Sequence, residues 1–268
     1  MSGGIAMRTV SFIATLAFGL AAAAAAVRPA AVETFVSGLG NDSNAAANCP
    51  RTNPCRTLAG AYPVTQSGGE IIALDPADYG PLTVTGPISI LGVEGAVIAV
   101  APGTTGIAIN AHAGDKIIIG RLSISGAGAP NTTGIALNGG YLVLRNSTLK
   151  LLTTGLRVSN TKADLLQVDV VGNSTGISAT GTGANANNSS ITGPTQVRLF
   201  FGSAVDNTTA YVMNDPGSGN SSILEFTLQD GAWAWSTGMA GNGTLVSGTG
   251  SGCPCSQLGT FFGPNNPN

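Results

Sequence analysis

Residues 132–177 read TTGIALNGGYLVLRNSTLKLLTTGLRVSNTKADLLQVDVVGNSTGI. A Thr-Gly pair followed by Ile or Leu begins this stretch, recurs inside it and ends it. Its glycines, Gly134, Gly155 and Gly176, are equally spaced, and an earlier copy at Gly106 precedes Gly134 by a somewhat longer interval. A short run follows each glycine in which apolar residues alternate with others. This period of two indicates a strand with one side facing inward.

A second strand is expected before each of these Thr-Gly-Ile or Thr-Gly-Leu repeats, with mainly apolar residues at matching positions. The corresponding residues are Ile119, Leu122 and Ile124, then Leu144, Ser147 and Leu149, then Leu165, Val168 and Val170. Between them, two outward columns are expected: Arg121, Asn146 and Gln167 in one, and Ser123, Thr148 and Asp169 in the next. A fainter turn is expected one interval before Gly106, with Gly80 in the equivalent position.

Short strands that repeat at this near-constant interval, without a helical period, predict a β-solenoid. One turn of such a chain cannot bury its own apolar side, whereas stacked turns bury it together and pair each other's backbone edges. Leucine-rich repeats have a similar length, but their spaced Leu and Asn pattern is missing. A β-sandwich would show hairpin turns rather than equivalent glycines in fixed register.

The composition excludes several classes of protein. The 268 residues include 39 Gly and one His, with 11 Lys and Arg against 13 Asp and Glu, for a net charge of −2. No basic face for nucleic acid is expected from this balance. Lys, Glu and Leu are too few for a helical bundle, and 43% hydrophobic residues do not fit a disordered chain.

The N-terminus predicts export. Residues 1–26 have the pattern of a signal peptide, with Arg8 before an apolar run that ends in an Ala-x-Ala site at Ala24 and Ala26. The expected location is secreted, periplasmic or on the cell surface, with no membrane segment after cleavage. The expected division is an N-terminal strand and capping helix over 27–68, a β-helix over 69–250 and a C-terminal tail over 251–268.

The cysteines fit an oxidising compartment. Cys49 and Cys55 lie close together around a Pro-rich turn, and Cys253 and Cys255 form a C-x-C pair. Disulfides within each pair are favoured because both are local, although pairing between the two ends stays open. A zinc site is the alternative, but the usual C-x-x-C spacing is absent, so no metal is expected.

A short helix is predicted after the first cysteine pair. Thr57 is a suitable N-cap, and Leu58, Ala61 and Tyr62 would share one helical face. Such a helix could cover the open apolar end of the solenoid.

The N-terminal region resembles secreted right-handed parallel β-helix proteins of the pectin-lyase-like superfamily. The matching residues are Phe35-Val-Ser-Gly-Leu-Gly-Asn-Asp42, then Asn53-Pro-Cys-Arg-Thr-Leu58, Gly69-Glu-Ile-Ile-Ala-Leu74, Tyr79-Gly80 and Ile88-Ser-Ile-Leu-Gly92. The family pattern is a YVS-x-x-G-x-D strand, a capping helix and a G-x-x-I-x-x-x-x-G-x-Y first coil. The resemblance covers roughly residues 34–180 and implies the all-β, right-handed parallel β-helix fold with a short N-terminal capping helix.

The superfamily includes pectate lyases, polygalacturonases and pectin methylesterases, but their motifs are missing here. The one histidine, His112, is expected in a turn. The best enzymatic set is Asp164, Asp169 and Arg145, which would suit a calcium-dependent polysaccharide lyase. Trp233 and Trp235, on one predicted strand with a single residue between them, would share one side and could stack on sugar rings or cover the last coil.

These observations favour an exported scaffold or glycan-binding protein without a recognisable active site or cofactor. Its expected partner is a polysaccharide or cell-envelope glycan. Two alternatives stay open. One is a carbohydrate-active enzyme such as a lyase for acidic polysaccharide, with calcium needed only in that case. The other is an adhesin or assembly subunit.

Overall fold

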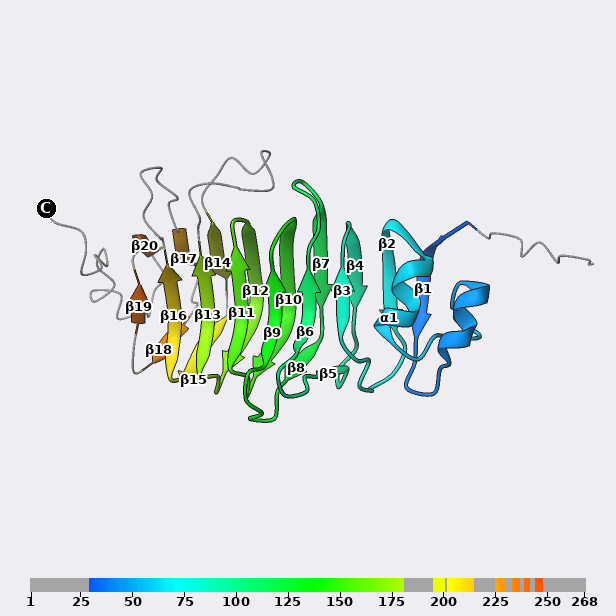
Figure 1. Ribbon diagram of the computed structural model, residues 1–268, viewed down its shortest axis with the longest axis horizontal. Helices are drawn as coiled ribbons and strands as arrows, with labels where there is room; N and C mark the ends of the chain where they lie inside the picture. The colour runs from blue at the N-terminus through cyan, green and yellow to red at the C-terminus, as the bar shows by residue number, and fades with distance from the viewer. Residues whose placement is uncertain are drawn as a thin grey trace, which may run out of the picture.

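The computed structural model describes residues 29–180, 195–200, 202–214, 225–229, 233–236, 239–241 and 244–247. The chain winds as a parallel β-helix whose strands form three faces. In Figure 1 it runs up the near side and down the far side as it advances from right to left, which is a right-handed winding. This confirms the β-solenoid predicted from the repeats and the right-handedness implied by the family resemblance.

The first face contains β2 and the strands that stack on it, with β1 added at the N-terminal edge. In spatial order it consists of β1 (Ala31–Val36), β2 (Thr65–Ala73), β4 (Ile88–Leu91), β7 (Lys116–Gly120), β10 (Tyr141–Lys150), β12 (Lys162–Val171), β14 (Gln196–Phe200), β17 (Glu225–Gln229) and β20 (Thr244–Ser247). All neighbouring pairs are parallel.

The second face follows a sharp bend, and β10 and β12 continue through that bend. It also contains β5 (Val97–Ala99), β8 (Ser123–Ser125), β15 (Ser203–Asn207) and β18 (Trp233–Ser236). Arg121, Asn146 and Gln167 have left-handed φ angles of 57°, 47° and 54° at this bend. The Asn146 side-chain amide donates to Gln167 Oε1 at 2.9 Å, so the expected column of outward residues forms here.

The third face contains the Thr-Gly-Ile repeats. It consists of β3 (Leu82–Val84), β6 (Thr105–Ile109), β9 (Thr133–Leu137), β11 (Thr154–Ser159), β13 (Thr175–Thr180), β16 (Thr209–Asn214) and β19 (Met239–Gly241). Ile107, Ile135, Leu156 and Ile177 pair in register and are buried in the interior. The faint first turn is displaced by one residue from its expected position, because Leu82 pairs with Ile107 and Gly80 therefore does not lie opposite Gly106.

Two buried asparagines hold the bend between the second and third faces. The Asn173 amide nitrogen donates to Asn207 Oδ1 at 2.9 Å, and Asn173 Oδ1 accepts from the Leu152 backbone N–H at 2.9 Å. The exposed pair Asn110 and Asn138, at matching positions after Gly106 and Gly134, forms a similar contact.

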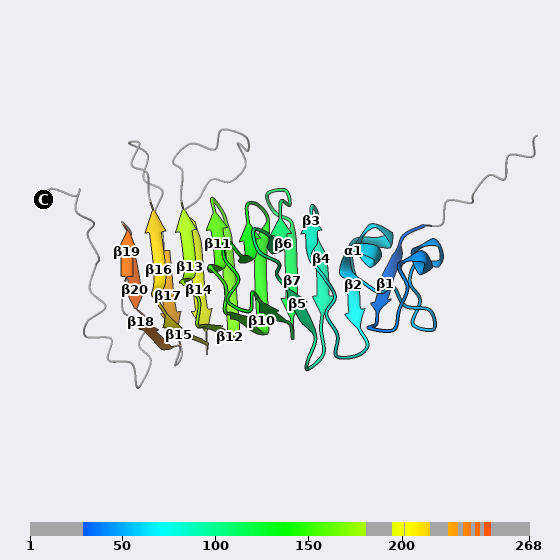
Figure 2. The same ribbon diagram turned by 60° about the horizontal axis from the view of Figure 1, so that its bottom comes forward.

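The N-terminal end is closed by α1 (Leu58–Ala61), between two 3-10 helices, η1 (Asp42–Ala47) and η2 (Tyr62–Val64). Figures 1 and 2 both show α1 beside β1 and β2 at this end of the coil. The Thr57 hydroxyl accepts from the Gly60 N–H at 3.0 Å, and Leu58 and Ala61 are buried, so the predicted N-cap and apolar side are confirmed.

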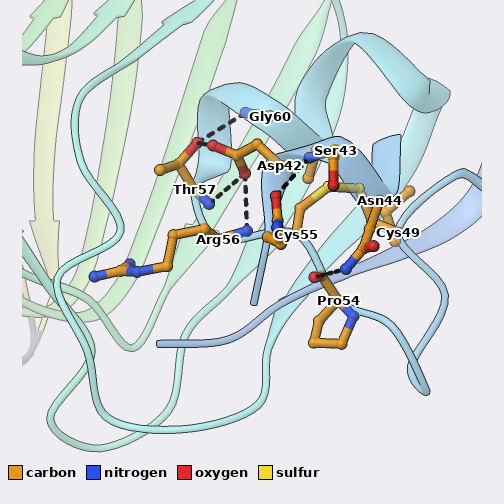
Figure 3. The surroundings of a disulfide bond; sticks show 12 residues. Asp42, Ser43, Asn44, Cys49, Pro54, Cys55, Arg56, Thr57 and Gly60 are labelled. Carbon is orange, nitrogen blue, oxygen red and sulfur yellow. Dashed lines mark hydrogen bonds between the residues drawn. A yellow bond between two sulfur atoms is a disulfide. The ribbon is translucent and has the colours of Figure 1, made fainter. Parts of the chain in front are cut away.

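A disulfide between Cys49 and Cys55 and the carboxylate of Asp42 fix the loop before this helix (Figure 3). Asp42 accepts from the backbone N–H groups of Arg56 and Thr57 at 2.8 and 2.9 Å. The predicted local pairing is confirmed for Cys49 and Cys55, while Cys253, Cys255, the 1–26 segment and the 251–268 tail lie outside the described residues.

A second carboxylate, Asp75, ties β1 to the first coil. It accepts from the Ser37 hydroxyl at 2.6 Å, the Gly38 N–H at 2.7 Å and the Tyr79 hydroxyl at 2.7 Å. Burial alone would raise the pKa of Asp75, but these donors outweigh it and hold the pKa below the ordinary value. The residues on which the family resemblance rests thus have structural roles in this chain.

Candidate functional site

The outer side of the first face is unusually apolar. Its outward positions include six half-buried hydrophobic side chains, namely Ile72, Leu91, Ile118, Val143, Leu166 and Phe200. The outer side of the third face has mainly Thr, Ser and Ala instead, such as Thr105, Thr133 and Thr154. A solvated sheet face normally alternates apolar inside with polar outside. A partly exposed apolar strip with polar neighbours is typical of a contact surface.

One polar cluster is fixed within this strip. Register places Asp164 next to Arg198, whose Nε and terminal nitrogen donate to the two Asp164 oxygens at 2.6 and 2.5 Å. The Tyr141 hydroxyl also donates to this carboxylate. Asp164 is only 8% exposed, so its charge is stabilised by the bidentate arginine pair rather than by water.

Both partners have shifted pKa values as a result. The hydrogen bond to Asp164 raises the pKa of Arg198. Burial, together with the same carboxylate, raises the pKa of Tyr141. The Asp164 carboxylate therefore accepts three hydrogen bonds, two from Arg198 and one from Tyr141.

A hollow lies on the same face, where Gly120 occupies an outward position between Leu91 and Arg145 in register. Because Gly120 has no side chain, a notch of about 200 Å³ forms there. We refer to it as the Gly120 notch, and its lining residues are Glu70, Ser89, Ile90, Leu91, Ile118, Gly120, Arg121, Arg145 and Asn146. Neither Arg121 nor Arg145 forms an ion pair with any residue that the structure describes.

A second hollow lies past the bend, on the outer side of the second face. It has a volume of about 480 Å³ and shares Arg121 and Asn146 with the Gly120 notch. Glu94 lines this second hollow as Glu70 lines the first. Arg121 and Asn146 therefore form a ridge between the two hollows, and Arg145 lines only the first hollow.

The residues predicted for lyase chemistry are distributed over two faces. Arg145 and Asp164 lie on neighbouring strands of the first face, out of register with each other and without an ion pair between them. Asp169 lies beyond the bend on the second face, where it accepts from the Ser203 hydroxyl. No group of three or more His, Cys, Asp or Glu suited to a metal occurs among the described residues.

The other predicted residues are placed only in part. Trp233 pairs in register with Ser203 on the second face, and Trp235 lies on the same strand. The side chains of both tryptophans are outside the described part, so their contact with sugar remains a prediction. His112 lies in an exposed turn near Asp115, as expected.

Sequence reasoning missed Gly120, Tyr141 and Arg198. Asp164 and Arg198 are 34 residues apart, an interval longer than the repeat, so the repeat does not align them. The repeat does not identify Gly120 as a special position, because its register partners Leu91 and Arg145 have quite different side chains and no residue type recurs there. The signal that could have found it is a glycine inside an apolar strand, Lys116-Ile-Ile-Ile-Gly120.

No helix among the described residues is long and apolar enough to span a bilayer. No protein-family model matches the chain, and no curated protein does. Among solved structures, the crystal structure of pectate lyase Pel9A aligns with a TM-score of 0.35 and 13% identity, over 80% of this chain and 79% of that chain. The strand pairings establish the fold independently of this likeness: the chain is a right-handed parallel β-helix with a capped N-terminal end.

Proposed function

We propose that this protein is a glycan-binding β-helix that holds an acidic polysaccharide along the outer side of its first face. One observation supports this proposal above the others. Two exposed arginines, Arg121 and Arg145, lie beside a notch in a half-exposed apolar strip and have no ion-pair partner among the described residues.

The chemistry of this face suits a sugar chain with acidic groups. Aliphatic side chains such as Leu91 and Ile118 offer apolar area to the C–H side of a pyranose ring, and polar groups beside them fix its orientation. A guanidinium group donates two parallel hydrogen bonds to a carboxylate or a sulfate ester. The face can therefore contact both the ring and its charged substituent.

Binding without turnover fits the state of Asp164. Arg198 and Tyr141 already donate to this carboxylate, so it is not a free base near Arg145. Export is also part of the proposal, with support from the signal-like residues 1–26 and from the Cys49–Cys55 disulfide.

Affinity electrophoresis tests this proposal, with polygalacturonate, alginate and dextran sulfate in the gel and uncharged dextran as the counterpart. We expect retardation by at least one acidic polymer, less retardation at high salt and none by dextran. Arg145→Gln should weaken binding about tenfold, since hydrogen bonds to charged groups contribute about 1.5–3 kcal/mol each.

Arg157→Gln is the matched control, because Arg157 is exposed on β11 of the third face. Equal weakening by both substitutions would indicate a nonspecific charge effect and contradict the proposed site. Unsaturated sugars released with calcium but not with a chelator would contradict binding without turnover and favour a lyase.

A further inference from the structure

Close packing requires glycine at several positions of this coil, but it does not require glycine at Gly120. At Gly106, Gly134 and Gly155, an added Cβ would lie 2.8, 2.5 and 2.6 Å from the backbone oxygen of the next coil. At Gly120, the nearest atoms to an added Cβ are Arg145 O at 3.6 Å and Leu91 Cδ1 at 3.8 Å. These are ordinary contact distances, so alanine would fit at Gly120.

Glycine at this position therefore weakens the strand without relieving any crowding. A glycine inside a strand lowers the stability of the fold by about 0.5–1 kcal/mol relative to alanine, because glycine loses more backbone conformational freedom on folding. Its φ angle is also not in the left-handed region. What glycine provides at this position is the open volume of the Gly120 notch.

From this contrast we infer that the Gly120 notch is a subsite for one pyranose ring of an acidic glycan, with the ring's anionic substituent directed toward Arg121 and Arg145. The inference rests on the proposed function and adds to it the position, the size and the orientation of one bound sugar unit.

The size of the notch limits its occupant. Its volume of about 200 Å³ is smaller than the roughly 300–1,000 Å³ of pockets that enclose drug-sized ligands. It therefore takes one ring rather than several. Neighbouring sugar units of the glycan would lie on the apolar strip and across the ridge at Arg121.

The charges at the two ends of the notch set the orientation. Glu70 lies on β2 and Arg145 on β10, three strand spacings apart, which is about 14 Å between backbones. Glu70 repels an anionic substituent and accepts hydrogen bonds from hydroxyl groups, whereas Arg121 and Arg145 donate to carboxylate or sulfate oxygens. A ring bound between them is expected to direct its charge toward the arginine end.

Filling the notch tests the inference. Gly120→Ala and Gly120→Val would be compared with wild type by isothermal titration with oligomers of polygalacturonate and of alginate, and by thermal unfolding. We expect both variants to fold with stability equal to or above wild type. Gly120→Val should lower affinity about tenfold, or about 1.4 kcal/mol, and Gly120→Ala should lower it by less. Ala108→Val, on the outer side of the third face, should leave affinity unchanged.

The possible outcomes separate this inference from the proposed function. Wild-type affinity in Gly120→Val, together with weak binding by Arg145→Gln, would overturn the subsite and leave the proposed function intact. A wild-type protein that binds none of the acidic oligomers would overturn both. If Gly120→Val fails to fold, the affinity of Gly120→Ala tests the subsite instead, and wild-type affinity in that variant would overturn it. A clear loss of stability in Gly120→Ala would refute the claim that the fold does not need this glycine.

Discussion

Alanine at Gly134 adds one methyl group at a point where successive coils of the third face are in contact. The added Cβ would lie 2.5 Å from the Gly155 backbone oxygen and 2.8 Å from Leu152 Cδ1. Cβ atoms in proteins do not approach other heavy atoms this closely, so β9 and β11 must separate or tilt locally. The pairing of Thr133 with Thr154 on the same two strands opposes that movement.

The magnitude follows from two opposing effects. Overpacking a well-packed interior by a methyl group costs about 1–3 kcal/mol. Replacing glycine by alanine also restricts the unfolded chain, which returns about 0.4–1 kcal/mol. We therefore expect Gly134→Ala to lower the free energy of unfolding by about 1–2 kcal/mol. Only the second effect operates in Gly120→Ala, which should equal or exceed wild type in stability.

Equilibrium unfolding in urea, followed by far-UV circular dichroism, measures this difference. The two variants carry the same substitution in neighbouring parts of the coil, so they differ mainly in what the methyl group meets. The reasoning is refuted if Gly134→Ala is as stable as Gly120→Ala. A structure of Gly134→Ala with unchanged strand spacing and unchanged stability would refute it as well.

Three further predictions concern stability. Asp75→Asn should make the free energy of unfolding depend less on pH in acid. The pKa of Asp75 is held below its ordinary value of 3.8, so the stability that this carboxylate contributes is fully present above that value and is lost as pH falls through the lower, folded-state pKa. Urea unfolding at stepped pH would measure the difference. Asn173→Leu should lower the free energy of unfolding in urea by about 3 kcal/mol, because the Leu152 N–H and the Leu149 carbonyl lose their buried hydrogen-bond partners. A loss below about 1 kcal/mol would contradict this account of the bend. Removing the Cys49–Cys55 disulfide by double substitution to serine should cost about 2 kcal/mol through the unfolded chain. Thermal melting would measure this loss, and reductant should lower the melting temperature of wild type more than that of the variant, because only wild type has this disulfide.

The interior of this fold could be predicted because its residues repeat. The alternating residues after Gly134 and Gly155 indicate which side chains face inward. The observed strand register agrees with that prediction. The one-residue error at Gly80 has a physical cause. Gly80 has a left-handed φ of 70° and serves a turn, with nothing within 4 Å of an added Cβ, so it does not stack as Gly134 does.

The outer surface could be predicted much less well. The column containing Ser123, Thr148 and Asp169 was expected and is observed. The partnership of Asp164 with Arg198 was not expected, because it depends on which coil follows β12 and not on the repeat. Outward residues are under no common packing constraint, so their contacts follow from the three-dimensional register alone.

Arginine labelling tests the central claim, that the outer side of the first face binds the glycan, most directly. The protein would be treated with phenylglyoxal with and without a saturating acidic oligosaccharide, and each arginine would be quantified by mass spectrometry. We predict that the ligand slows modification of Arg121 and Arg145 and leaves the exposed Arg157 of the third face unchanged. Saturated binding with no protection of Arg121 and Arg145, or with equal protection of Arg157, would contradict the account.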